Sequence, residues 1–285
     1  MNIFSYSTLI MFGIMAPSTE AASLLLDFGT GTPSGGTSGV ATLADAEKSP
    51  GYSAHVGETT YNYGNSSTSS SLLYGDGSPA TGVTVTIAAE STIGNNVINF
   101  ASGPALNYTG VTGTGVTVPG SAYAGNSPAR QAVFRNGSTG SNNSAMGTAI
   151  SGLSAGTYSI YMVGRNTNSG ANDAPANFFL SVIGGGTPAS FIFDGAGNTT
   201  QLTASASHTV ASLNGAAFES GVTHVEFLNV TIAEGETLLL ATEGTGADPR
   251  GFINSLEIVA VPEPSMALLP LASIGLIAMR RRRVA

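Results

Sequence analysis

The chain has 285 residues, a formal net charge of −8 and no cysteine, and only 9% of its residues are charged. Its length suits one all-β domain, since β-sandwiches and barrels often run to ~200–250 residues undivided. Without cysteine, the chain has no disulfides, zinc–thiolate sites, iron–sulfur clusters or thiol catalysis. Between residues 22 and 260, five basic residues stand against fifteen acidic ones. This excess of ten negative charges argues against binding to a phosphate backbone, so no nucleic-acid partner is expected.

The N-terminus has the order of a secretory signal peptide over residues 1–21. An apolar run from Leu9 to Ala16 is followed by Pro17 and by small residues up to Ala21. Cleavage is expected after Ala21. No Lys or Arg precedes the apolar run, so a buried core segment remains the alternative reading of this stretch.

The middle of the chain has the patterning of an all-β body. Residues 24–28 form an apolar first strand, which a glycine-rich stretch at 29–39 ends. From residue 83 to 88, apolar and small polar residues alternate with the period of two that marks a half-buried strand. Further strands are expected at residues 97–100, 157–163, 177–183, 190–194, 222–233, 237–241 and 252–259.

One short helix is expected from residue 129 to 135. Ser127 is placed as its N-cap, Pro128 takes the first helical position, and Gly137 ends it. Strands at this spacing with almost no other helix favour two packed antiparallel sheets, a β-sandwich, over residues 22–260. The termini of jelly rolls often neighbour each other. Strands 24–28 and 252–259 are therefore expected to pair or to neighbour each other, and to share a core.

Four segments carry a resemblance to galactose-binding-like jelly rolls. They are similar to the first strand, the central hairpin and the last strand of that fold, and they comprise residues 25–29, 152–158, 164–167 and 251–258. The resemblance implies a β-sandwich ectodomain. A fold of this kind hosts many activities, so function has to be argued from a site.

Catalysis needs a base, and the histidines are His55, His208 and His224. His224 is expected on the polar face of a strand and His208 in a Ser/Thr-rich turn. Residues 74–78 are similar to the Gly-Asp-Ser block of SGNH hydrolases, but they carry an extra glycine, and no Asp-x-x-His follows near the C-terminus. We therefore expect no enzymatic role, and an extracellular polysaccharide hydrolase is the alternative.

Sugar binding is the more plausible activity, because jelly rolls often stack a sugar ring on an aromatic side chain and hold its hydroxyls with polar loop residues. The chain has no tryptophan, so tyrosines in glycine-rich contexts and one polar cluster are the candidates: Tyr52, Tyr61, Tyr63, Tyr74, Tyr123, Arg165, Asn166 and Asp173. The alternative is that these are solvated loop groups. Asp194 and Asn198, separated by glycines, are candidate ligands for a structural calcium ion. No other cofactor is expected.

The C-terminal residues 261–285 form a distinct tail. Pro262, Glu263 and Pro264 lead into an apolar run from residue 266 to 279, which is closed by Arg280, Arg281, Arg282 and Arg283. At ~1.5 Å per residue, this run reaches only ~21 Å as a helix, less than the ~30 Å hydrocarbon core of a bilayer. The arginines are expected to stay on the cytoplasmic side, which puts the rest of the chain outside. A basic helix lying on the membrane surface fits poorly, since the run has no polar face.

The order of Pro-Glu-Pro, short apolar run and arginine cluster resembles the PEP-CTERM sorting signal of bacteria that make exopolysaccharide. The resemblance implies a transient anchor in the inner membrane and cleavage by an exosortase-like membrane protease. It further implies a final location in the outer cell envelope or extracellular matrix. The sequence therefore predicts an exported surface or matrix protein of structural or glycan-binding type, with exopolysaccharide or a neutral glycan as partner.

Overall fold

The computed structural model describes the body of the chain in thirteen stretches. They comprise residues 23–28, 38–40, 49–63, 68–90, 92, 94–101, 106–108, 132–135, 144–165, 176–193, 204–208, 218–245 and 250–262. Regular structure in these stretches is β, apart from one 3-10 turn, η1 (Tyr52–Ala54). No helix among the described residues has the length and apolarity needed to cross a bilayer. The expected signal peptide and the tail beyond Pro262 lie outside them.

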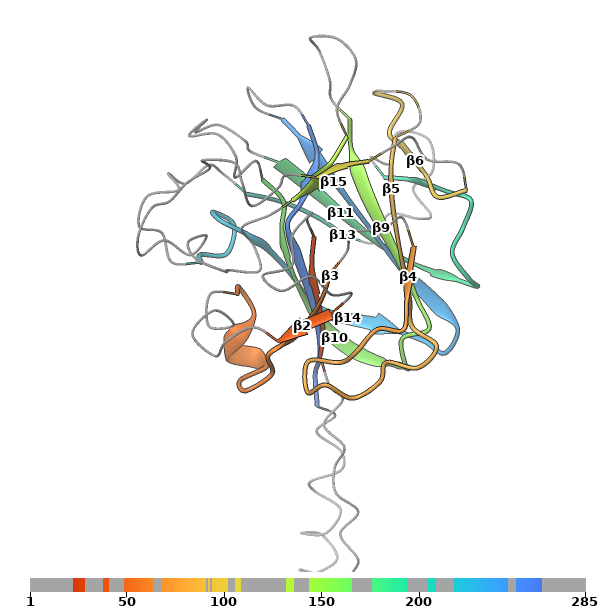
Figure 1. Ribbon diagram of the computed structural model, residues 1–285. Coiled ribbons are helices and arrows are strands. Elements are labelled where there is room, and N and C mark those ends of the chain that lie inside the picture. The colour runs from red at the N-terminus through yellow and green to blue at the C-terminus, as the bar shows by residue number, and fades with distance from the viewer. Residues whose placement is uncertain are drawn as a thin grey trace, which may run out of the picture. The chain divides into compact units, whose positions relative to one another are not determined.

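Two six-stranded sheets make up the body (Figure 1). Sheet A runs in the order β14 (Val225–Ile232), β10 (Gly156–Val163), β17 (Ser255–Ala260), β1 (Leu24–Asp27), β3 (Thr60–Tyr63) and β2 (Ser38–Val40). Sheet B runs in the order β13 (Ala204–His208), β11 (Ala176–Gly184), β15 (Glu236–Gly244), β9 (Met146–Ser151), β5 (Thr84–Ala89) and β4 (Thr68–Ser70). Pairing is antiparallel throughout both sheets except between β1 and β3, which are parallel.

Two small sheets complete the fold. One pairs β12 (Ser190–Ile192) with β6 (Val97–Asn99), and the other joins β16 (Phe252–Ile253), β8 (Val133–Phe134) and β7 (Asn107–Tyr108). The β12–β6 pair contributes Phe191 and Ile98 to an apolar cluster with Phe179 and Leu239 of sheet B. Because Leu180 and Leu240 face the main core instead, this pair covers the opposite face of sheet B.

The main core lies between sheets A and B. Alternate residues of the strands, such as Leu26 and Ile258 from sheet A and Ile87 and Leu240 from sheet B, belong to one buried apolar cluster. Burying each such side chain contributes about 1.5–3 kcal/mol, so this shared cluster is the main source of stability. The prediction of an all-β fold built from antiparallel sheets is confirmed, with the parallel β1–β3 pair as the exception.

The expected pairing of the two ends of the body is also confirmed. Strand β1 pairs antiparallel with β17, in a register that sets Leu24 opposite Ile258 and Asp27 opposite Ser255. Alternate residues of both strands face the same side of the sheet. Their inward residues share the main core, and their outward residues form part of the opposite face of sheet A.

The expected helix at residues 129–135 is wrong where it can be checked. Val133 and Phe134 form β8, which pairs with β16, and residues 127–131 lie outside the described stretches. Phe134 packs with Ala132 and Phe252, and the Arg250 guanidinium lies 5.0 Å from the ring centre of Phe134. Local capping signals are weaker than this non-local apolar packing, so the strand forms instead.

Two histidines also differ from expectation. His208 is the last residue of β13 and pairs with Ala176, so it lies in a strand and not in a turn. His224 is buried and precedes β14, which begins at Val225, so it is not a polar-face residue of a strand. The expected strand at 222–233 is shorter because residues 219–224 form a hydrogen-bonded turn, in which Thr223 N donates to Glu219 O.

Candidate functional site

The outer face of sheet A carries the candidate site. Tyr161 on β10 lies opposite Glu226 on β14 and opposite Glu257 on β17, so the three form a row across adjacent strands. The neighbours Ile160 and Met162 point into the main core, which places the Tyr161 side chain on the outer face. Tyr161 and Glu226 are both partly exposed, whereas Glu257 is buried.

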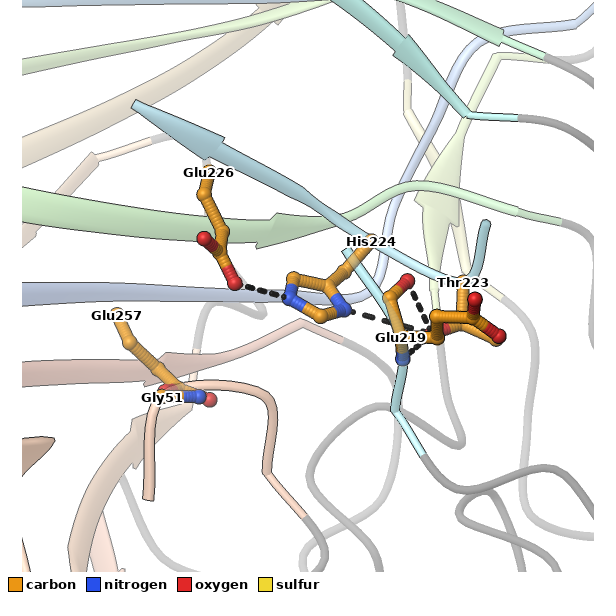
Figure 2. Close-up of polar contacts among 6 residues, drawn as sticks. All are labelled: Gly51, Glu219, Thr223, His224, Glu226 and Glu257. Atoms are coloured by element: carbon orange, nitrogen blue, oxygen red, sulfur yellow. Dashed lines mark hydrogen bonds and ion pairs between the residues drawn. The ribbon is translucent and has the colours of Figure 1, made fainter. Parts of the chain in front are cut away.

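Glu257 anchors the η1 loop, residues 49–58. Its Oε2 accepts a 2.7 Å hydrogen bond from the Gly51 backbone N–H (Figure 2) and lies 3.2 Å from His55 Nε2. The other oxygen, Oε1, is buried and has no hydrogen-bond partner among the described residues. A chain segment far away in sequence is thus fastened to the outer face of β17 through one carboxylate.

His55 does not complete a catalytic relay. Ser49 Oγ lies 3.3 Å from the same Nε2 atom that contacts Glu257, and His55 Nδ1 has no hydrogen-bond partner among the described residues. A relay needs the nucleophile on one ring nitrogen and the orienting acid on the other. The side chains of His55 and Glu257 are both fully buried, so this group holds the η1 loop in place.

His224 has a hydroxyl on one side and a carboxylate on the other, as Figure 2 shows. Its Nε2 lies 3.0 Å from Glu226 Oε1, and its Nδ1 lies 3.3 Å from Thr223 Oγ1. Thr223 Oγ1 donates a hydrogen bond to Glu219 O and accepts one from Glu219 N. Thr223 is 0% exposed, so the hydroxyl is not presented to a substrate, and the arrangement fixes the imidazole beside Tyr161.

Aromatic rings surround His224. The ring centres of Tyr161 and His224 lie 6.4 Å apart at an interplanar angle of 42°. The ring centres of Phe218 and His224 lie 5.9 Å apart in an edge-on contact. Such edge-to-face and tilted contacts favour a rigid arrangement. Tyr161 is therefore held by its neighbours while part of it stays open to solvent.

The electrostatics of this face are negative. Burial, and then the charges of Glu226 and Glu257, raise the pKa of Tyr161 above its ordinary value. On neighbouring strands, burial raises the pKa of Asp27 well above its usual range, and burial followed by the charge of Glu257 raises the pKa of Tyr61. All three shifts mean that the deprotonated, negatively charged form of the side chain is disfavoured on this face.

The candidate tyrosines predicted from the sequence have different surroundings. Tyr52 is partly exposed on η1 and packs against Leu25 and Tyr61, so the structure brings these two candidates together on the outer face of sheet A. Tyr61 is only 2% exposed, which leaves Tyr52 as the accessible ring of the pair. Tyr74 is partly buried and packs against the main core, and Tyr63 is the last residue of β3.

Of the polar candidates, only Arg165 lies within the described residues. Arg165 is 1% exposed, and its backbone N–H donates a 2.7 Å hydrogen bond to Asn254 Oδ1. The remaining candidates lie outside the described residues: Tyr123, Asn166, Asp173, Asp194 and Asn198. Within the described stretches, no group of three His, Asp or Glu residues is placed to hold a metal ion. The proposed calcium ligands are thus untested.

The block at residues 74–78 is a turn. Asp76 Oδ1 accepts hydrogen bonds from Ser78 N at 2.8 Å and from Ser78 Oγ at 2.7 Å, and these bonds lower the pKa of Asp76. Tyr74 N donates to Ser78 O across the same turn. The Ser78 hydroxyl therefore stabilises the turn by donating to Asp76.

Sequence reasoning missed Tyr161, Glu226 and Glu257. A signal for them exists, since Tyr161 alternates with core residues on β10 and Glu257 lies between Leu256 and Ile258 on β17. Alternation identifies the outward face of each strand. It does not identify which strands are neighbours, and only the order β14–β10–β17 brings the three residues together.

Comparisons with known proteins give only distant structural similarity. No protein-family model and no curated protein matches this chain. The carbohydrate-binding module TmCBM61 in complex with β-1,4-galactotriose is 14% identical, with a TM-score of 0.28, over 62% of this chain and 88% of that one. The CBM36-1 domain of a multidomain xylanase from the hindgut metagenome of Trinervitermes trinervoides is 13% identical, with a TM-score of 0.24, over 63% and 99%.

A family 35 carbohydrate-binding module from Clostridium thermocellum is 14% identical, with a TM-score of 0.24, over 46% of this chain and 88% of that one. At identities and TM-scores this low, the ligand and activity of this chain have to be argued from its own residues.

Proposed function

We propose that this chain is an exported surface or matrix protein that binds glycan on the outer face of sheet A and performs no catalysis. The observation that supports the binding site most directly is the partly exposed Tyr161 ring between Glu226 and Glu257. A sugar ring presents an apolar C–H face, which stacks on an aromatic ring, and hydroxyls, which donate to carboxylate oxygens. Tyr161 and Glu226 supply both kinds of contact on one rigid surface.

The η1 loop makes this surface preorganised. A Cβ atom at Gly51 would lie 2.4 Å from Glu257 Oε2 and 2.5 Å from Tyr161 Cδ2, so the loop backbone packs directly against both groups. The next residue, Tyr52, adds a second partly exposed ring. Groups that are already held in place lose little conformational freedom on binding, which favours affinity.

Export is the second part of the proposal. Its support is the order of Pro-Glu-Pro, apolar run and four arginines in residues 262–283. The arginine cluster favours a cytoplasmic C-terminus, and the sandwich would then be delivered outside. The exosortase-like protease and the final location in the envelope or matrix belong to this proposal.

The alternative function is hydrolysis of an extracellular polysaccharide. The order Thr223–His224–Glu226 is the observation that favours it, because a hydroxyl, an imidazole and a carboxylate lie within hydrogen-bond reach. Burial of Thr223 argues against it. Incubation of the chain with the polysaccharides it binds, followed by an assay for new reducing ends, separates binding from hydrolysis.

A glycan array probed with the full chain tests the binding proposal. We expect weak binding to neutral glycans, lost in Tyr161→Ala and retained in Leu228→Ala, which removes an exposed side chain from neighbouring β14. Acidic polymers should be repelled most at low salt, since screening takes hold beyond ~10 Å at 0.1 M, and added Ca²⁺ should weaken the repulsion. Equal glycan binding by the wild type and Tyr161→Ala would exclude the outer face of sheet A as the binding site.

A further inference from the structure

We infer that the preferred ligand of this face is a glycan carrying primary amines, such as a polymer of de-N-acetylated hexosamine units. The inference rests on the glycan-binding function proposed above and specifies its ligand class. An ammonium group beside Tyr161 would meet the aromatic ring and the Glu226 carboxylate together. A neutral sugar uses the ring and the hydrogen-bond acceptors but leaves the charge of the face uncompensated.

The first line of support is the charge inventory around Tyr161. Glu226 and Glu257 flank it, and one oxygen of each carboxylate contacts a histidine Nε2, Glu226 Oε1 that of His224 at 3.0 Å and Glu257 Oε2 that of His55 at 3.2 Å. The described stretches contain three Lys or Arg residues: Arg135, Arg165 and Arg250. Arg135 donates to Glu90 O, Arg250 stacks on Phe134 and Phe252, and the Arg165 side chain is buried.

The second line of support is Glu257 Oε1. Buried carboxylate oxygens normally have hydrogen-bond or ionic partners, because burying a polar atom without one is unfavourable. This oxygen has none among the described residues, although its side chain is fully buried beside the Tyr161 ring. Glu257 Oε2 is already engaged with Gly51 N and His55 Nε2, so Oε1 is the oxygen left to attract a cation near the ring.

The geometry suits an ammonium group in particular. A cation within ~6 Å of a tyrosine ring centre is attracted by the ring, and an N–H donated to a carboxylate is stronger than a neutral hydrogen bond. Glu226 is partly exposed and lies one strand away from Tyr161, so one amine can reach both. N-acetylation removes the charge and adds bulk, so it should remove this advantage.

Isothermal titration of the full chain with two matched ligands tests the inference. Oligomers of β-1,4-linked glucosamine and of N-acetylglucosamine of equal length are compared at a pH at which the amines carry protons. The glucosamine oligomer should bind at least about tenfold more tightly. Glu226→Gln should weaken its binding about fivefold. Glu234→Gln, which removes the same charge from an exposed turn between β14 and β15, should leave binding unchanged.

The other outcomes separate the inference from the function on which it rests. Equal binding of both oligomers, lost in Tyr161→Ala, would overturn the amine preference and leave glycan binding intact. No binding of either oligomer or of any arrayed glycan would overturn both. Tighter binding of oligolysine with the same sensitivity to Glu226→Gln would assign the face to a basic peptide instead. Thermal unfolding of each variant confirms that it is folded.

Discussion

The backbone N–H of Gly51 donates a 2.7 Å hydrogen bond to Oε2 of Glu257, 206 residues further along the chain. This contact fastens the η1 loop to the strand that pairs with β1, and it sets the loop against the edge of the Tyr161 ring. The same carboxylate therefore holds the loop in place and contributes charge to the proposed binding face. Changes at Gly51 should affect both stability and the site.

Gly51→Ala should destabilise the chain by about 1–3 kcal/mol, because the added methyl would lie 2.4 Å from Glu257 Oε2 and 2.5 Å from Tyr161 Cδ2. The free energy of unfolding from urea denaturation measures the effect. Gly186→Ala is the matched control, since its methyl group would meet nothing within 4 Å. Equal stabilities for the two variants would contradict the close packing of the η1 loop.

Asp27→Asn should stabilise the chain at neutral pH. Burial raises the folded-state pKa of Asp27, so its contribution to stability is fully present below the unfolded pKa of ~3.9 and is lost as pH rises through the folded pKa. Asparagine mimics the protonated form and removes this loss. Thermal unfolding between mildly acidic and neutral pH should show an advantage for Asp27→Asn that shrinks towards acid.

Asp76→Asn is the control, because we expect it to change the stability at neutral pH in the opposite direction. Hydrogen bonds from Ser78 lower the pKa of Asp76, so its contribution is present above the unfolded pKa and is lost as pH falls through the folded pKa. This exposed variant should be slightly less stable at neutral pH, with a difference that also shrinks towards acid. A destabilised Asp27→Asn at neutral pH would indicate that the Asp27 carboxylate is held by a favourable partner.

The strands that the sequence predicts have either a clear apolar period of two, such as β5 and β10, or a short apolar run, such as β1. Strands β2, β4 and β13 were missed because they consist mostly of small residues (Gly, Ser, Thr and Ala), which form strands only where neighbouring strands pair with them. Strand β9 was missed for a related reason. Its small residues, including Gly147, leave room for the Ile98 side chain of β6, which a Cβ would meet at 2.8 Å.

The candidate site was less predictable than the fold. The alternation on β17 shows from the sequence that Glu257 points away from the core. Its partners Gly51 and His55 lie about two hundred positions earlier in a polar region, and no local pattern links them to β17. Burial was equally hidden, since Tyr61 lies in the same kind of glycine-rich context as Tyr52 and yet is covered by it.

Asn62→Asp should destabilise the chain by about 2–4 kcal/mol. The Asn62 amide donates to Leu25 O at 3.0 Å and to Leu73 O at 2.7 Å, and its Oδ1 accepts from Leu73 N at 2.8 Å. A carboxylate can keep only the accepted bond and would face two carbonyl oxygens. Asn95→Asp is the control, because Asn95 Oδ1 only accepts, from Val97 N, at an exposed position. Comparable urea midpoints for the two variants would contradict this role.

The sorting tail gives the last prediction, which concerns the charge of Arg280 to Arg283. If these four positive charges hold the C-terminus on the cytoplasmic side, replacing all four by glutamine should impair membrane retention and processing. Replacement by lysine keeps the charge and should preserve both. Cell fractionation reports retention, and mass spectrometry of the mature chain reports whether it ends near Pro262 to Pro264. Normal surface delivery and cleavage of the glutamine variant would show that the arginines do not set the orientation, and the sorting proposal would then fail at its most specific feature.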